Sequence, residues 1–171
     1  MRPLALSCLA VALTGCPSGP PELPEGEDAC RPMNRAKVLE VIDGDTADVL
    51  HLDGDAADTE ERIRFLGVNT PEIDHDDLLS SDFCAVRAWD ETKSLIEGGD
   101  VWLTYDFDCL GEFDRTLAYV FPVDTEVWVN QHLVESGYAR VPSFPFSFED
   151  DFLSLEEEAQ LAGRGLWGAC E

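Results

Sequence analysis

A short stretch of the sequence, residues 41–72, gathers side chains of the types that hold a divalent cation beside a phosphate. They are Asp43, Asp45, Arg64, Asn69 and Glu72. Carboxylate and amide oxygens are the ligands that a hard cation such as Ca²⁺ prefers. A guanidinium group binds phosphate oxygens through two parallel hydrogen bonds. The cation would balance the acids while the arginine holds the anion; the alternative is a surface β-meander whose acids are only solvated.

The segments around this cluster predict three antiparallel strands that would position it. Apolar and polar side chains alternate in three successive segments, at residues 36–42, 46–52 and 62–68. Such alternation is typical of strands that bury one face. Gly44 and Gly54 each follow an aspartate between these segments, and an Asp-Gly pair is a strong hairpin signal. On this alternation we place His51 on the solvent side of its strand.

The rest of the chain predicts a helix, two more strands and two further helices. The helices are expected at residues 84–96, 129–136 and 152–162, and the strands at 101–107 and 116–121. The loop at residues 108–115 carries Arg115 to the start of the last strand. In the closing helix, Leu153 and Leu161 are expected to face inward. This order of elements is expected of an OB-type barrel with helical additions.

Residues 1–15 are typical of an export signal. Residues 3–12 are apolar, too few to span a bilayer, and a Leu-Thr-Gly-Cys sequence ends the segment at Cys16. This ending resembles a bacterial lipobox, so we expect lipidation of Cys16; the alternative is an ordinary signal peptide with an incidental cysteine. Residues 16–31 are rich in Pro, Gly and Glu and are expected to form an extended tether, followed by one folded domain at residues 32–171.

The chain contains 6 cysteines, and 4 of them remain when Cys8 in the signal and Cys16 are set aside. They are Cys30, Cys84, Cys109 and Cys170. An even number in an exported chain favours two disulfides, with three possible pairings. We expect Cys84 to pair with Cys109, tying a helix start to a nearby loop, and Cys30 with Cys170, tying the termini. No C-x-x-C spacing is present, so a zinc site is not expected.

The formal net charge of −25, from 36 acidic and 11 basic residues, is extreme for 171 residues. A polyanionic partner such as nucleic acid is repelled by such a chain. The acidic surface is explained either by solubility in a salty or calcium-rich exterior or by calcium bound at the surface. If nucleic acid is the partner, moderate salt should relieve the repulsion, because the Debye length shrinks to about 10 Å at 0.1 M.

Five stretches, in order and at matching intervals, resemble the staphylococcal nuclease-like (thermonuclease) family across nearly the whole folded domain. They are VIDGDT at 41–46, RFLGVNTPE at 64–72, DRTLAYVF at 114–121, VNQHLVESGYARV at 129–141 and EEEAQLAGRGLWG at 156–168. Each is weak alone, and together they are specific. The resemblance implies an α+β, mainly β fold: a five-stranded OB-fold barrel with about three helices.

The resemblance also implies a calcium-dependent phosphodiesterase that cleaves DNA or RNA. Asp45 matches the family's direct calcium carboxylate, and Thr70 matches the residue whose backbone carbonyl also binds the ion. Asp43 stands behind these ligands. Asn69 occupies a position where a calcium-binding aspartate is common, so the site has one formal charge less. Its amide oxygen can still coordinate the ion.

Three residues match the family's catalytic groups. Glu72 matches the acid that orients or deprotonates the attacking water, and Arg64 and Arg115 match the arginines that grip the scissile phosphate. We therefore expect an exported, monomeric nuclease, held by lipid on Cys16 in the periplasm or at the cell surface. The competing hypotheses are a non-catalytic OB-fold binding module and an acidic calcium-binding surface lipoprotein.

Overall fold

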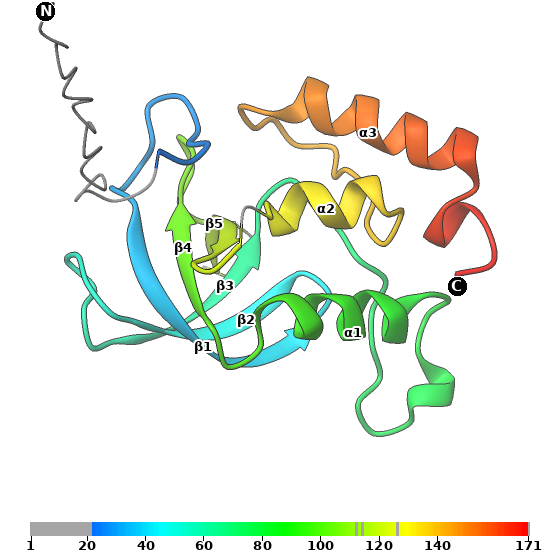
Figure 1. Cartoon of the computed structure of the whole chain (residues 1–171), viewed down its shortest axis with the longest axis horizontal. Coiled ribbons are helices and arrows are strands. Elements are labelled where there is room, and N and C mark those ends of the chain that lie inside the picture. The colour runs from blue at the N-terminus through cyan, green and yellow to red at the C-terminus, as the bar shows by residue number, and fades with distance from the viewer. Residues whose placement is uncertain (1–21, 112, 114, 126, 171) are drawn as a thin grey trace, which may run out of the picture.

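Five strands close into a barrel in the computed structural model, which describes residues 22–111, 113, 115–125 and 127–170 (Figure 1). The strands are β1 (Asn34–Asp43), β2 (Thr46–His51), β3 (Glu60–Phe65), β4 (Asp100–Thr104) and β5 (Thr116–Pro122), and their order around the barrel is β1-β2-β3-β5-β4. The described part of the chain also contains three α-helices. The predicted α+β, mainly β class and the five-stranded OB-fold barrel are therefore confirmed. The predicted signal segment and Cys16 lie outside the described residues.

The pairing of the strands brings two distant parts of the sequence together. β1, β2 and β3 form an antiparallel meander, whereas β3 and β5 pair in parallel. In that parallel pair, Ile63 lies opposite Thr116 and Arg64 opposite Leu117. The end of β3 therefore lies beside the start of β5, which Arg115 directly precedes.

Side chains on alternate positions of the strands fill the barrel. Ala47, Val49 and His51 on β2 are all buried, since residues two apart in a strand share a face. The prediction that His51 faces solvent is wrong: its side chain is 1% exposed and bonds Asn34 at 2.8 Å and Glu61 at 2.9 Å. The apolar Leu50 and Leu52 favoured the opposite face, but a buried hydrogen-bonding network makes the interior acceptable to the imidazole.

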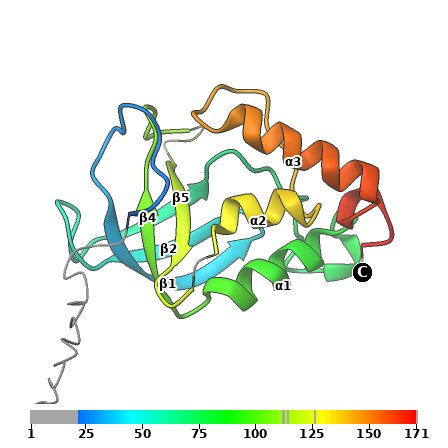
Figure 2. The ribbon, with the colours of Figure 1, turned by 45° about the horizontal axis from the view of Figure 1, so that its top comes forward.

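The three α-helices are α1 (Ala85–Ile96), α2 (Val129–Glu135) and α3 (Glu149–Ala162), and they cover one side of the barrel (Figure 2). The side chain of Asn130 joins α2 to the strands, because its amide donates to the carbonyls of Leu66 and Ala118 at 2.9 and 3.1 Å. It also accepts a hydrogen bond from the backbone N–H of Val120. These bonds fix α2 against β5, whose residues are all buried.

Helix α3 begins three residues earlier than predicted, at Glu149. Its first turn holds Glu149, Asp150 and Asp151, and negative charges stabilise a helix N-terminus. Phe152 and Ala159 form its buried side. The expected inward orientation of Leu153 and Leu161 is wrong, since these side chains are 43% and 82% exposed. None of the helices among the described residues is both long enough and apolar enough to cross a membrane.

The predicted disulfide pairing is wrong: Cys30 pairs with Cys109 and Cys84 with Cys170. The physical reason is the path of the two chain ends. Residues 22–31 run along the rim of the barrel beside the loop between β4 and β5, so that Cys30 meets Cys109. After α3 the chain turns back toward the start of α1, where Cys170 meets Cys84 (Figure 1).

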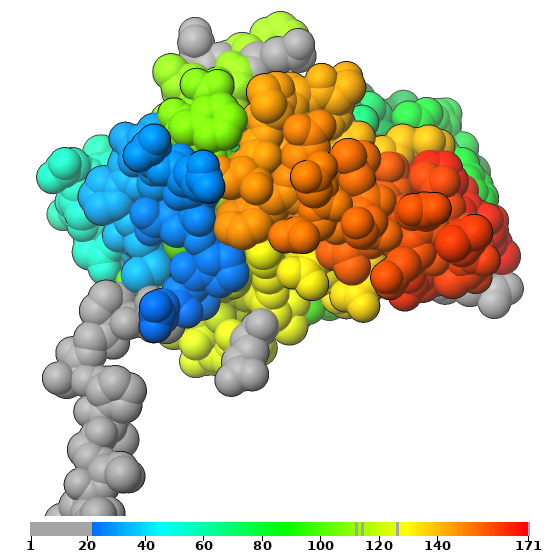
Figure 3. Space-filling model, turned by 90° about the horizontal axis from the view of Figure 1, so that it is seen from above, coloured from blue at the N-terminus to red at the C-terminus, as the bar shows by residue number. Residues whose placement is uncertain are grey.

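The second half of the expected tether packs against the barrel. The backbone N–H groups of Gly26 and Cys30 donate to the carbonyls of Tyr105 and Asp106, at 2.9 and 2.8 Å. Leu23 packs against the apolar core. Viewed from above, this N-terminal segment (blue) lies beside the β4–β5 loop and the segment that leads into α3 (Figure 3). Residues 22–31 are therefore part of the folded unit.

Candidate functional site

The turn between β1 and β2 buries a carboxylate close to the segment that follows β3. Asp45 is 0% exposed. One of its oxygens accepts a hydrogen bond from the backbone N–H of Thr70 at 2.7 Å, and the other from the hydroxyl of Thr46 at 3.1 Å. Gly44 makes this approach possible, because a Cβ there would collide with the side chain of Thr70. Asp43 closes the turn by accepting the backbone N–H of Asp45 at 3.0 Å.

Arg64, near the end of β3, joins the turn to Asn69. Its guanidinium forms an ion pair with Asp45 and donates to the amide oxygen of Asn69 at 2.7 Å. Burial raises the pKa of Asp45 to about 7, because the attraction of Arg64 offsets only part of the desolvation and Asp43 adds repulsion. A carboxylate with so strongly perturbed a pKa beside a cavity is typical of a functional site.

Asn69 is held by its backbone rather than by its side chain. It forms an isolated antiparallel bridge with Arg140, with N···O distances of 2.8 and 2.9 Å. Arg140 is an exposed residue to which the sequence analysis gave no role, although it lies within one of the five matching stretches. Its guanidinium stacks over the ring of Trp167 at 4.4 Å. The bridge leaves the amide of Asn69 exposed beside Arg64.

Arg64 and Arg115 both line a cavity of about 610 Å³. Asn69 lies on its wall, and the exposed rings of Phe107 and Phe144 flank it. Arg64 lies on β3 and Arg115 directly precedes β5, so the two arginines are neighbours only because β3 pairs with β5. Two guanidinium groups in one cavity suit an anion with several oxygens, and flanking aromatic rings suit a nucleobase.

Glu72 lies in a second, neighbouring cavity of about 380 Å³. Asn69 lines both cavities, and Thr70 and Arg140 line the second. The structure thus joins Asp45, Arg64, Asn69 and Thr70 by direct contacts, adds Arg115 through the first cavity, and places Glu72 beyond Asn69. The backbone carbonyl of Glu72 accepts from Asp82 at 3.1 Å, which ties its loop to the segment before α1.

The donor groups can be compared with the needs of calcium. Within the described residues, no three Asp, Glu, His or Cys side chains gather closely enough to hold a metal ion. The oxygens of Asp45 and Asn69 nevertheless both accept hydrogen bonds from the cationic guanidinium of Arg64, each from one of its two terminal nitrogens. Oxygen donors that already bind a cationic group fit a hard metal ion in kind. A full set requires main-chain oxygens or water as well.

His75 lies near this turn, on the acidic loop after Glu72. Its Nε2 lies 2.6 Å from the carbonyl oxygen of Ile42, and its ring meets Trp89 edge-on at 5.4 Å. The imidazole therefore anchors the loop to β1 and α1.

Comparisons with known proteins identify the family of this chain. The sequence model of the family described as "Staphylococcal nuclease homologue" matches residues 62–169. A thermonuclease of Staphylococcus intermedius is 35% identical over 123 residues, 72% of this chain and 67% of that protein. A thermonuclease of Staphylococcus hyicus is 29% identical over 133 residues, 77% of this chain and 74% of its own.

An uncharacterized protein of the archaeon Methanocaldococcus jannaschii is also similar. It is 32% identical over 151 residues, which cover 77% of this chain and 70% of that protein. The family match spans more than half of the chain and includes Arg64, Asn69, Glu72 and Arg115. This chain therefore belongs to the staphylococcal nuclease homologue family.

Proposed function

We propose that this protein is a calcium-dependent nuclease that hydrolyses phosphodiester bonds of DNA or RNA. The observation that carries the proposal is the shared cavity of Arg64 and Arg115, with Asn69 on its wall and Glu72 in the adjoining cavity. The family relationship and the two thermonuclease relatives support it. Each role below is part of the proposal.

Arg64 and Arg115 hold the scissile phosphate. Phosphodiester hydrolysis builds negative charge on the phosphoryl oxygens, and guanidinium groups fixed in a partly closed cavity stabilise that charge. The cavity gives both groups access to one ligand. Arg64 contacts Asp45 and Asn69 in the structure, so the strand and its neighbours already fix its direction before substrate binds.

Glu72 orients the attacking water or accepts its proton. It is exposed and lies on the far side of Asn69 from the arginine cavity. A general base must approach the water on the side opposite the leaving oxygen, so separation of base and phosphate ligands suits an in-line attack. Closure of the remaining distance would accompany substrate binding, since catalytic contacts tighten in the complex.

Calcium would be held by Asp45, the amide oxygen of Asn69 and the backbone carbonyl of Thr70, with Asp43 behind them. Bound there, the ion would supply positive charge facing the phosphate. Asp45 must be ionised to bind a cation, so its raised pKa makes protons compete with calcium near neutral pH. Asn69 contributes no charge.

The substrate class follows from the cavity walls. Phe107 and Phe144 are 42% and 40% exposed and flank the arginines. A stacking base must be unpaired, so we expect single-stranded or denatured nucleic acid to be preferred. The overall charge of −25 opposes the long-range attraction of nucleic acid, and Arg64 and Arg115 counter this repulsion within the cavity.

The export and anchoring of the protein are proposed from the sequence of residues 1–16, and we propose a monomer. Lipidation of Cys16 would hold the folded unit at a membrane in the periplasm or at the cell surface. Fractionation of cells that express the full chain tests this. The parent should sediment with membranes, and Cys16→Ala should be released to the soluble fraction.

The decisive experiment is a cleavage assay on denatured DNA with the full chain, in calcium and in chelator. We expect cleavage in calcium, loss in chelator and strong loss in Glu72→Gln. A non-catalytic OB-fold module would bind a labelled oligonucleotide without cutting it. An acidic calcium-binding lipoprotein would neither bind nor cut. Either of these outcomes in the parent chain overturns the proposal.

A further inference from the structure

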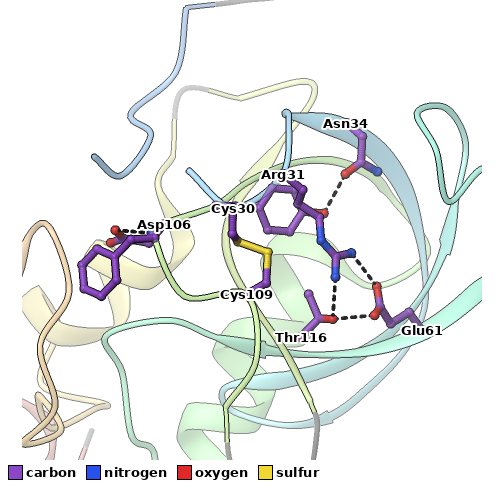
Figure 4. The surroundings of a disulfide bond; sticks show 9 residues. Cys30, Arg31, Asn34, Glu61, Asp106, Cys109 and Thr116 are labelled. Atoms are coloured by element: carbon purple, nitrogen blue, oxygen red, sulfur yellow. Dashed lines mark hydrogen bonds and ion pairs between the residues drawn. A yellow bond between two sulfur atoms is a disulfide. The ribbon is translucent and has the colours of Figure 1, made fainter. Parts of the chain in front are cut away.

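The N-terminal segment, residues 22–31, is bonded to both walls of the arginine cavity, at Asp106 in one wall and at Ser147, which follows Phe146 of the other. On one wall, Cys30 forms the disulfide with Cys109 (Figure 4). The backbone N–H of Cys30 also donates to the carbonyl of Asp106 at 2.8 Å. On the other wall, the backbone N–H of Glu27 donates to the hydroxyl of Ser147 at 2.8 Å. The whole of this segment was expected to belong to an extended tether.

Asp106 joins the two walls beneath this segment. Its carboxylate accepts the backbone N–H and the hydroxyl of Ser147, at 2.8 and 2.7 Å, and the hydroxyl of Tyr119 at 2.5 Å. Gly26 lies directly against it, where a Cβ would collide with the aspartate. Burial alone would raise the pKa of Asp106, but these donors hold its pKa below 3.8, so it is a charged anchor at neutral pH.

Arg31 reaches from this segment to the start of β5. One nitrogen of its guanidinium donates to Glu61 and the other to the hydroxyl of Thr116, each at 3.2 Å (Figure 4). The guanidinium also lies over the ring of Tyr105, 5.0 Å from its centre. Thr116 in turn donates to Glu61. Guanidinium, carboxylate and hydroxyl thus form a closed triangle of hydrogen bonds around the residue that follows Arg115.

Arg115 therefore lies on a loop that the N-terminal segment holds at both ends. The disulfide fixes Cys109, and Arg31 fixes Thr116. Within the loop, the N–H of Gly111 donates to the carbonyl of Arg115 at 2.9 Å. A loop without such supports samples positions several ångströms apart, whereas a phosphate ligand misplaced by about 1 Å can lose a factor of about 100 in rate.

We propose that Arg31 is a positioning residue for Arg115, and that together with the Cys30–Cys109 disulfide it forms a brace that fixes the phosphate-binding wall of the cavity. The inference rests on the proposed function, in which Arg115 binds phosphate. The residues that the N-terminal segment contributes, Cys30 and Arg31, lie before residue 62, outside the part of the chain that the family model matches, whereas their partners Cys109 and Thr116 lie within it. The brace thus joins this chain's N-terminal segment to the matched region.

The first test is a double-mutant cycle in the full chain, in a Glu72→Gln background that binds without cutting. The probe is a fluorescently labelled single-stranded hexanucleotide in calcium buffer. Arg31→Lys retains the charge but loses the planar fork whose two nitrogens meet Glu61 and Thr116, so neither contact keeps its geometry. We expect roughly tenfold weaker binding in Arg31→Lys, and less than about a twofold change when Arg115 is already alanine.

The matched control for this substitution is Arg35→Lys. Arg35 belongs to β1 and pairs with Asp53 at 3.6 Å, away from the cavity. It should leave binding unchanged. If Arg31→Lys weakens binding equally with and without Arg115, its effect does not pass through Arg115 and the inference is wrong. If the parent does not bind the probe at all, the proposed function fails instead, so the two failures are distinguishable.

The second test compares the two disulfides, which span similar lengths of chain, 79 and 86 residues. Their contributions to the entropy of the unfolded chain are nearly equal. We expect Cys30→Ser/Cys109→Ser to weaken probe binding roughly tenfold and to increase hydrogen exchange at residues 107–117. The Cys84→Ser/Cys170→Ser variant, compared at equal thermal stability, should change neither probe binding nor hydrogen exchange at residues 107–117. Equal loss of binding in both variants, or unchanged exchange at residues 107–117, would overturn the inference.

Discussion

Two of the ion pairs in the molecule, Asp45 with Arg64 and Glu61 with Arg31, each join a buried or half-buried carboxylate to an arginine. Both arginines donate to a second polar group, Asn69 in the first pair and Thr116 in the second. The residue types are alike, but the electrostatic states of the two carboxylates are opposite.

The ionised carboxylate of Glu61 is stabilised by its neighbours. Its burial would raise its pKa, but hydrogen bonds from Thr116 and His51 and the charge of Arg31 hold that pKa below 4.5. Asp45 is buried more deeply and has Asp43 beside it, so its pKa rises to about 7 despite Arg64. A carboxylate whose charge is stabilised supports the fold, whereas one whose charge is poorly compensated is ready to bind a cation. The comparison supports a structural role for Glu61 and the proposed cation-binding role of Asp45.

The largest expected effect is on catalytic activity, and it distinguishes the two arginines of the cavity from other arginines of the barrel. Arg64→Ala and Arg115→Ala should each lower kcat by about 100- to 1,000-fold, the usual cost of removing one group that stabilises transition-state charge. The measurement is steady-state cleavage of denatured DNA. Arg62→Ala is the matched control on the same strand, because Arg62 is exposed and pairs with Asp48 at 2.6 Å. Near-normal turnover in either cavity variant would remove the arginines from the mechanism.

The second effect is on the stability of the fold, and it distinguishes the carboxylate of Glu61 from that of Asp45. Glu61→Gln should lower the free energy of unfolding by about 2 kcal/mol, since it weakens hydrogen bonds to charged groups. Asp45→Asn should stay within about 1 kcal/mol of the parent at pH 7, because an aspartate with a pKa of about 7 is already half protonated there. Urea unfolding in calcium-free buffer measures both. A larger loss in Asp45→Asn than in Glu61→Gln would reverse the assignment.

The third effect is the pH dependence of these contributions. The pKa of Glu61 is lowered on folding, so its stabilising effect is complete well above pH 4.5 and is lost as the pH falls through its folded pKa. The pKa of Asp45 is raised, so without calcium its contribution decreases as the pH rises from about 4 toward 7. The difference in free energy of unfolding between the parent and Glu61→Gln should become smaller as the pH falls. As the pH rises, the Asp45→Asn variant should gain stability relative to the parent. Urea unfolding at a series of pH values checks both signs.

The smallest effect concerns calcium affinity. Asn69→Asp should bind calcium more tightly, by a factor of about 10, because ligand charge governs the affinity of oxygen sites. Titration calorimetry of calcium into the full chain measures it. Ser154→Asp adds the same charge on an exposed part of α3 and should leave the affinity unchanged. Weaker binding in Asn69→Asp would mean that this side chain is not a ligand.

The sequence by itself determined the barrel, because alternation, turn glycines and the order of elements are local signals. It also placed Asp45, Arg64, Asn69 and Thr70 in one short stretch, and the structure joins them by direct contacts. The proposed roles of these residues await the experiments above. Arg115 could be placed on a loop before the last strand, but only the parallel pairing of β3 and β5 puts it in the cavity of Arg64.

Only the tertiary structure decided the features that depend on distant chain ends. Neither the pairing of Cys30 with Cys109 nor the packing of residues 22–31 follows from local pattern, because each depends on where the chain lies after the barrel has closed. His51 shows the same limit: its face of β2 is acceptable only because Asn34 and Glu61, from two other strands, supply its hydrogen bonds. Local sequence sets which elements form, whereas the partners that satisfy a buried polar group or a thiol come from residues far away in the chain.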